Sequence, residues 1–315
     1  MKRLLLIVLL GLALPAAAQY PNRNVTMLAG YPAGGLVDIV ARMVAENMKP
    51  RFPHGLVVVN RPGAAGSVAV GELTRSAPDG YTIILTPHSA LVIAPQINDL
   101  PYKTPDEYDP FINLVAYYPL IAVRSESKYQ TIQELLTDAK DNPGMIRVGS
   151  PGEGTSSHLN LEELMHHAGV KMLHVPYAGW AQSSVSLLGG HIEAVVAQPG
   201  ELKPMVDGKR MRALVNFTPK RHATFPDVPA AKELGWDVSN GIWYLLMVAK
   251  GTPAPVVRYL HDAAKAAIDD PKFRETMNSR GIDVDYRTAE ALRADLWREY
   301  KLTTPILQRT GMIKK

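Results

Sequence analysis

The chain of 315 residues contains no cysteine. This absence excludes disulfide bridges, a thiolate nucleophile and any metal site with cysteine ligands. No run of four or more Lys or Arg residues occurs, and 34 Lys and Arg residues face 30 Asp and Glu residues, so nothing favours nucleic-acid binding. Beyond the first 18 residues no apolar run is long enough to span a bilayer, and the sequence predicts no membrane span.

Three common enzyme signatures are also missing. The dinucleotide fingerprint G-x-G-x-x-G, the phosphate loop G-x-x-x-x-G-K-[ST] and the nucleophile elbow G-x-S-x-G do not occur. The glycines Gly149, Gly152 and Gly154 follow a different order, G-x-x-G-x-G. Nucleotide binding and serine hydrolysis are therefore not favoured.

The chain does contain enough apolar material for a folded core. Hydrophobic residues make up 46% and charged residues 20%, which excludes a disordered or fibrous protein. At about 100–200 residues per domain, the length predicts roughly two domains.

The first 18 residues have the pattern of a secretory signal peptide. Lys2 and Arg3 precede an apolar stretch over residues 4–15, and the alanines at 16–18 form a cleavage signature. An N-terminal anchor or a buried helix is the alternative. Removing residues 1–18 takes away two basic residues and no acidic one, which leaves 32 against 30, a net charge of +2. An exported protein without cysteine fits the bacterial periplasm.

The remaining chain alternates strand and helix patterns, which predicts βαβ units and an α/β fold. Apolar strand-like runs lie at 25–29, 56–59, 81–85, 120–123, 146–148, 172–175, 192–197, 211–217 and 244–249. We predict two lobes, each a mostly parallel sheet flanked by helices. Lobe 1 comprises residues 19–121 and 242–315, and lobe 2 comprises 122–241. We predict no strand after about Tyr286, so the helical tail should pack against lobe 1. Such folds bind ligands between the lobes, at the carboxyl ends of strands.

Three turns that follow strands and open helices are candidate anion sites. Glycines allow close backbone approach, and free N–H groups at a helix start attract anions without Lys or Arg. The alternative is ordinary turn chemistry, with Thr155 or Ser156 acting as a helix cap. The candidate residues are Tyr31, Ala33, Gly34 and Gly35 in the first turn, His88 and Ser89 in the second, and Ser150, Gly154, Thr155 and Ser156 in the third.

Several side chains near these turns have two interpretations. Asp38, in the first turn of its helix, either bonds free N–H groups there or orients a ligand. Tyr177, Ala178, Gly179 and Gln198 follow strands at their carboxyl ends, where Tyr177 and the neighbouring Trp180 either cover an apolar ligand or fill the lobe core.

The histidines of one helix raise the question of a metal site. His158, Glu162 and His166 share one helix face at spacings of four residues. Leucines at 159, 161 and 164 make the same helix amphipathic, which makes ordinary surface pairs the better interpretation. We predict no metal and no cofactor, and keep His158 among the candidate ligand-binding residues.

Nine segments, in the same order along the chain, resemble the substrate-binding proteins of tripartite tricarboxylate transporters, the Bug receptors. They cover essentially the whole mature chain. The segments are residues 31–35 with Asp38 and Ala41-Arg42, residues 59–66, residues 77–82, Gly149-Ser150 with residues 152–154, His158-Leu159, residues 174–177 with Gly179, residues 187–190, residues 225–229 and residues 251–253.

The resemblance implies a type II periplasmic binding protein, a Venus flytrap whose lobes close over a small carboxylate without catalysis. In this family backbone groups and bridging waters hold one carboxylate, and the loops concerned match residues 31–35 and 149–157. Implied partners are the carboxylate and the inner-membrane transporter subunits, and we expect a monomer. The alternatives are an orphan receptor that signals to a membrane sensor kinase and a periplasmic enzyme on the same fold.

A few positions depart from the family pattern. Ala178 stands where Lys is common, Ala94-Pro95 where Asn-Pro is common, and Gly30-Tyr31-Pro32 where Pro-Phe is more usual. Without the Lys a highly charged, citrate-like ligand is less expected. We therefore predict a dicarboxylate or an aromatic carboxylate as the ligand.

Overall fold

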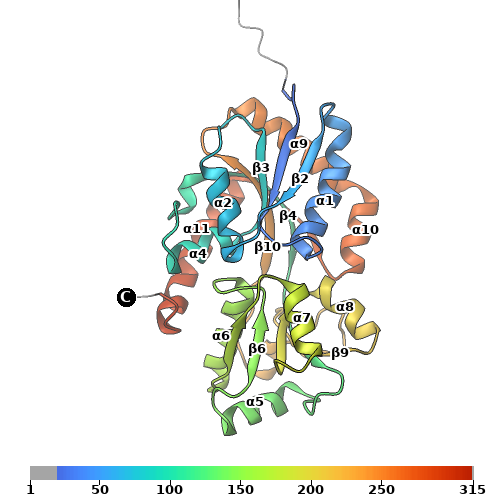
Figure 1. Cartoon of the computed structure of the whole chain (residues 1–315), viewed down its shortest axis with the longest axis vertical. Coiled ribbons are helices and arrows are strands. Elements are labelled where there is room, and N and C mark those ends of the chain that lie inside the picture. The colour runs from blue at the N-terminus through green and yellow to red at the C-terminus, as the bar shows by residue number, and fades with distance from the viewer. Residues whose placement is uncertain (1–19, 314–315) are drawn as a thin grey trace, which may run out of the picture.

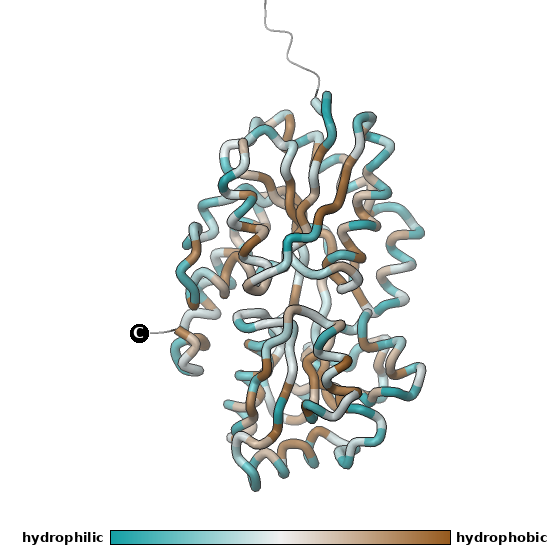
Figure 2. The backbone as a smooth tube through the Cα atoms, in the orientation of Figure 1, coloured by the Kyte–Doolittle hydropathy of each residue, from teal (hydrophilic) through white to brown (hydrophobic). Residues whose placement is uncertain are grey.

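The computed structural model describes residues 20–313, which form two lobes stacked along the long axis of the molecule (Figure 1). The predicted signal peptide, residues 1–18, lies outside the described residues. In each lobe a hydrophobic sheet lies between helices whose outer faces are more hydrophilic (Figure 2). Each lobe therefore has its own core, as expected of an α/β protein.

The upper lobe contains a six-stranded sheet in the order β11-β4-β10-β3-β1-β2. Its central strand β10 has eight consecutive buried residues, the pattern of a strand covered on both faces. The strands are β1 (Val25–Ala29), β2 (Leu56–Asn60), β3 (Thr82–Pro87), β4 (Tyr108–Tyr117), β10 (Ile242–Ala249) and β11 (Asp283–Thr288).

Helices cover both faces of this sheet. One face packs against α1 (Leu36–Met48), α9 (Ala254–Asp269) and α10 (Pro271–Ser279). The other packs against α2 (Ser67–Thr74), α3 (Ser89–Val92) and α11 (Ala289–Arg309), with the short α4 (Ala94–Ile97) beside them. The predicted packing of the C-terminal tail on the first lobe is confirmed, because Leu292, Leu296 and Leu307 of α11 are buried in this core.

The lower lobe contains a five-stranded sheet in the order β7-β6-β8-β5-β9. The strands are β5 (Leu120–Arg124), β6 (Arg147–Ser150), β7 (Leu173–Pro176), β8 (Ala194–Ala197) and β9 (Met211–Asn216). One face packs against α5 (Ile132–Asp141) and α6 (Ser156–Ala168), and the other against α7 (Trp180–Leu188) and α8 (Pro199–Asp207).

Two crossings of the chain explain the direction of the strands. In the upper sheet β1, β2, β3 and β4 run one way, whereas β10 and β11 run the other way. In the lower sheet only β5 opposes the remaining strands. After each crossing the chain enters the second sheet at the end that faces the other lobe. The neighbouring strands β3, β4, β8 and β9 end on that side, so β5 and β10, which begin there, must run antiparallel to them. The sheets flanked by helices are as predicted, but both sheets are mixed and not mostly parallel, since four of the nine strand pairs are parallel and five are antiparallel.

Two strands were not predicted. β4 lies next to β10, and β11 pairs with β4 at the edge of the sheet. The limit of about Tyr286 for the last strand is nearly right, because β11 ends at Thr288 and only α11 follows it among the described residues, but β11 itself was not expected. Its sequence DVDYRT carries three charged residues, which an edge strand open to water tolerates.

The residues that form each sheet indicate where one lobe ends and the other begins. The upper sheet takes its strands from residues 25–117 and 242–288, and the lower sheet from residues 120–216. We propose lobe limits at the two crossings that separate these ranges, close to the limits predicted from the sequence.

Candidate functional site

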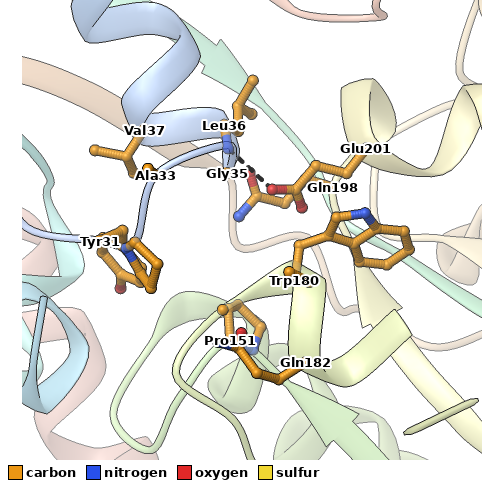
Figure 3. Close-up of a pocket in the computed structure, with 13 residues that line it drawn as sticks. Tyr31, Ala33, Gly35, Leu36, Val37, Pro151, Trp180, Gln182, Gln198 and Glu201 are labelled. Atoms are coloured by element: carbon orange, nitrogen blue, oxygen red, sulfur yellow. Dashed lines mark hydrogen bonds between the residues drawn. The ribbon is translucent and has the colours of Figure 1, made fainter. Parts of the chain in front are cut away.

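The carboxyl ends of β1, β6, β7 and β8 meet in a cavity between the lobes (Figure 3). The cavity has an empty volume of about 340 Å³, part of it open to solvent. Its upper wall is the turn from β1 into α1, and its lower wall is formed by Pro151 and the first turns of α7 and α8. The lining residues are Tyr31, Pro32, Ala33, Gly35, Leu36, Val37, Pro151, Gly179, Trp180, Ala181, Gln182, Gln198 and Glu201.

Asp38 holds the turn between β1 and α1. Its Oδ2 accepts the N–H of Gly34 at 3.0 Å, and its Oδ1 accepts the side-chain amide of Asn60 at 2.9 Å and pairs with Arg42 at 2.9 Å. Although burial opposes the change, these hydrogen bonds hold the pKa of Asp38 below its usual value. Gly34 has a φ of +83°, which favours glycine. Asp38 therefore bonds to its own turn in this structure.

Glu201 reaches the same turn from the other lobe. Its Oε1 accepts the N–H of Leu36, the first residue of α1, at 3.0 Å (Figure 3). The α1 N-terminus, with its positive end of the helix dipole, thus already holds a carboxylate. Burial raises the pKa of Glu201 to about 7, and the hydrogen bond from Leu36 opposes only part of this rise.

Gln198 lies one helical turn before Glu201 and is oriented by two tyrosines. Its Oε1 accepts the hydroxyl of Tyr244 at 3.0 Å, and the hydroxyls of Tyr244 and Tyr117 are 2.7 Å apart. Since Tyr244 donates to Gln198, Tyr117 must donate to Tyr244. This chain of hydrogen bonds turns the amide oxygen of Gln198 toward β10 and its nitrogen toward the cavity (Figure 3).

The turn between β6 and α6 is closed by its own hydrogen bonds. Gly154 donates its N–H to His158 Nδ1 at 3.3 Å, and His158 donates its backbone N–H to the Thr155 hydroxyl at 3.2 Å. The imidazoles of His158 and His174 stack 3.6 Å apart, and His174 Nε2 lies 2.7 Å from the Ser150 hydroxyl. Two backbone donors that the sequence suggested for an anion are thus engaged within the turn.

His88 lies in the interface between the lobes. Its ring stacks on Trp243 with centroids 4.4 Å apart, and its Nδ1 accepts the N–H of Trp243 at 3.4 Å. Its Nε2 lies 3.5 Å from the hydroxyl of Ser156 in the other lobe. Burial lowers the pKa of His88 to about 3, so the imidazole is neutral at physiological pH.

A second cavity lies between the lobes and shares Tyr31 and Pro151 with the first. Its empty volume is about 860 Å³, open solvent included. The residues on its upper side come from the turns after β1 and β2 and from the end of α4, and those on its lower side from the turns after β6 and β7. Its lining residues are Gly30, Tyr31, Gly63, Ala64, Ala65, Gly66, Asn98, Pro151, Gly152, Glu153, Pro176, Tyr177 and Ala178.

The candidate residues from the sequence divide into two groups. Those that line a cavity are Tyr31, Ala33, Gly35, Gly179 and Gln198 in the first, and Tyr31, Tyr177 and Ala178 in the second. Those that line neither are Gly34, Asp38, His88, Ser89, Ser150, Gly154, Thr155, Ser156 and His158. These nine support the turns or the contact between the lobes, and their role toward a ligand stays a prediction.

Sequence reasoning missed Glu201 as a site residue. An acidic side chain in the first turn of a helix is usual there, because it favours the dipole of its own helix. Glu201 contacts a different helix instead, 165 residues away in the chain. The spacing of three residues after Gln198 was the available signal, since it places both side chains on one face of α8.

Within residues 20–313 no group of three or more potential ligand side chains could hold a metal ion. His158 Nε2 lies 3.3 Å from Glu162 Oε1 on the same helix. The expected surface pair is wrong at this position, because His158 is buried and Glu162 is only partly exposed. In the same part of the chain no helix combines the length and the apolar character that a membrane span needs.

Comparison with known proteins decides the family. Residues 40–312 match the model of the tripartite tricarboxylate transporter family receptors. The chain belongs to this family. Its members are solute-binding receptors of the periplasmic binding protein type and not enzymes, as the resemblance of the nine segments implied. The receptor is 36% identical to a UPF0065 protein encoded in the gbd 5′ region of Cupriavidus necator, over 97% of this chain and 94% of that protein.

Solved structures support the two-lobed fold of the receptor. The periplasmic binding protein BugD superposes with a TM-score of 0.88 and 31% identity, over 94% of this chain and 100% of that one. A TctC solute-binding protein from Polaromonas, solved without ligand, superposes with a TM-score of 0.68 at 31% identity, over 92% of this chain and 99% of that one.

Proposed function

We propose that this receptor captures a small organic carboxylate in the periplasm and delivers it to a tripartite tricarboxylate-type transporter. One observation carries the proposal: the N-terminus of α1, in the wall of the cavity between the lobes, already binds a carboxylate, that of Glu201. Backbone N–H groups and a helix dipole suit a ligand anion as well as a side-chain anion. Carboxylate binding therefore needs no Lys or Arg in the wall.

For the class of ligand and for the cellular location of the receptor, we propose what the sequence predicted. Dicarboxylates and aromatic carboxylates are the two classes to test, and Tyr31 and Trp180 offer the cavity two aromatic side chains. The pattern of residues 1–18 supports export, and the family supports an inner-membrane transporter as partner. We further propose that the receptor acts as a monomer without cofactor.

Thermal-shift screening of the mature chain tests the proposal directly. At about 100 times its Kd, a ligand should add roughly 2.7 kcal/mol to the free energy of unfolding, because it binds only the folded state. We expect such stabilisation from at least one dicarboxylate or aromatic carboxylate. Sugars and organic cations of similar size serve as controls. A rise in melting temperature with these controls and with no carboxylate would contradict the proposal.

A further inference from the structure

The walls of both cavities between the lobes lack positive charge. The residues that line the two cavities include no Lys or Arg, and their two charged members, Glu201 and Glu153, are both acidic. Glu153 is exposed in the second cavity, whereas Glu201 is partly buried in the first. A receptor for carboxylates thus has an acidic side chain inside its own cavity, which becomes fully charged only above its pKa of about 7.

The partners of Glu201 are few. Its Oε1 accepts the N–H of Leu36, and within residues 20–313 it forms no ion pair. Its pKa is raised by burial and not by a neighbouring acid, so the charged form already lacks compensation. A second carboxylate beside it would add like-charge repulsion in a poorly hydrated site. A hydrogen-bond donor or an ammonium group would supply the missing partner.

Gln198 supplies the complementary group. Its amide is oriented by Tyr244, which leaves the nitrogen toward the cavity, and within the described residues this nitrogen donates no hydrogen bond. Gln198 and Glu201 lie side by side opposite the first turn of α1 (Figure 3). This wall therefore offers one donor and one acceptor to a bound molecule.

We propose that Glu201 makes the receptor select carboxylates whose other end carries a hydrogen-bond donor, such as an amide or ammonium group, over dicarboxylates. This inference rests on the proposed carboxylate binding and narrows it. Glu201 accepts the donor at one end of the ligand, and the ligand carboxylate lies at the other end. Of the two ligand classes predicted from the sequence, dicarboxylates and aromatic carboxylates, this inference disfavours the dicarboxylates.

Isosteric ligand pairs test the inference. Each pair is a dicarboxylate and its half-amide: terephthalate with 4-carbamoylbenzoate, succinate with succinamate, and glutarate with glutaramate. Titration calorimetry at pH 8 gives the Kd of each member, with Glu201 charged. We expect the half-amide of the best-bound pair to bind at least about tenfold more tightly than its dicarboxylate.

Glu201→Gln identifies the residue responsible. The amide keeps an oxygen for the N–H of Leu36, so the contact between the lobes survives while the charge is lost. We expect the preference to fall below about threefold, mainly because the dicarboxylate binds better. Glu299→Gln is the matched control: Glu299 is also partly buried with its pKa raised by burial, but it lines neither cavity. Its substitution should leave the preference unchanged.

The outcomes separate this inference from the proposed function. Dicarboxylates that bind the wild type as tightly as their half-amides would overturn the selectivity, and so would a preference that survives in Glu201→Gln. Carboxylate binding would stand in both cases. The Kd values of the wild type alone test the selectivity, even when the Glu201→Gln variant does not fold. If no carboxylate of a broad screen binds, the proposed function fails and the selectivity with it.

Discussion

Two carboxylates at the same helix N-terminus have opposite properties. Asp38 bonds to Gly34, Asn60 and Arg42, and its pKa is lowered. Glu201 has one backbone donor and no cation, and burial raises its pKa to about 7. The helix dipole is common to both, and Asp38 is the less exposed of the two. The difference therefore comes from the hydrogen bonds and the charge of Arg42 that Asp38 receives and Glu201 lacks. An acidic side chain that lines a cavity without a cation beside it is a candidate functional residue. Glu201 is therefore the more informative of the two carboxylates.

His88 should make the folded state sensitive to acid. Its pKa is lowered from 6.5 to about 3, so the unfolded chain binds this proton first as pH falls. The contribution of His88 to stability is thus complete above pH 6.5 and is lost as pH falls toward 3. Linkage gives a loss of about 1.4 kcal/mol from this group between pH 7.5 and pH 5.5.

Urea unfolding of the wild type and of His88→Gln at the two pH values measures this effect. The variant should lose less stability on acidification than the wild type, by about 1 kcal/mol. His54→Gln, at an exposed histidine, is the control and should behave like the wild type. Equal pH dependence in the wild type and His88→Gln would contradict the neutral, buried imidazole.

The turn from β6 into α6 brings a lower-lobe element against an upper-lobe helix. Gly154 has a φ of +73°, and a Cβ added there would lie 2.5 Å from Cδ1 of Ile97 in α4. Glycine is therefore required at this position for the backbone conformation and for the close approach of the lobes. The close approach to Ile97 concerns the closure of the lobes, because Gly154 and Ile97 belong to different lobes.

Gly154→Ala should weaken ligand binding by blocking full closure. The positive φ costs an alanine roughly 1–2 kcal/mol of stability, and the added methyl group collides with Ile97. Gly144→Ala is a matched control in the same lobe, with a φ of +79° and no atom within 4 Å of the added Cβ. We expect similar losses of stability in both variants, by thermal unfolding, and a loss of affinity in Gly154→Ala alone, by calorimetry. Equal affinities would argue against closure at this contact.

The two lobes are joined by two crossings and by side-chain contacts that span them. The crossings are Tyr118-Pro119 and residues 217–241, between β4 and β5 and between β9 and β10. Relatives with the same 31% identity superpose with TM-scores of 0.88 and 0.68. Hinge closure about the two crossings is the motion that we expect on binding.

The pair of Arg309 and Glu163 connects the C-terminal helix α11 to α6 in the other lobe. Arg309→Ala should favour the open arrangement of the lobes and weaken ligand binding by up to about fivefold, since a half-exposed pair contributes roughly 0.2–1 kcal/mol. Arg298→Ala is the control, because Arg298 pairs with Asp295 on the same helix and within one lobe. Small-angle scattering should show a larger radius of gyration for Arg309→Ala only. The same radius in both variants would exclude this role.

Much of the fold could be predicted from the sequence because it depends on local patterns. Apolar runs followed by amphipathic segments predicted β1, α1, β3, α6 and the tail helix. The glycine turns also indicated where strand ends meet. β4 and β11 were missed. Asp109, Pro110 and Asn113 interrupt the apolar pattern of β4. Half of the residues of β11 are charged, and its strand character comes from pairing with β4.

The candidate site shows the limit of such patterns. Composition and spacing were sufficient for the two lobes and for turns rich in free N–H groups, since both depend on neighbours in the chain. The occupant of the α1 N-terminus depends on Glu201, 165 residues beyond Leu36, and on a closure that leaves this carboxylate partly buried without a cation. Contacts between lobes leave no periodic mark in a sequence, so the charge inside the cavity became visible only with the lobes in place.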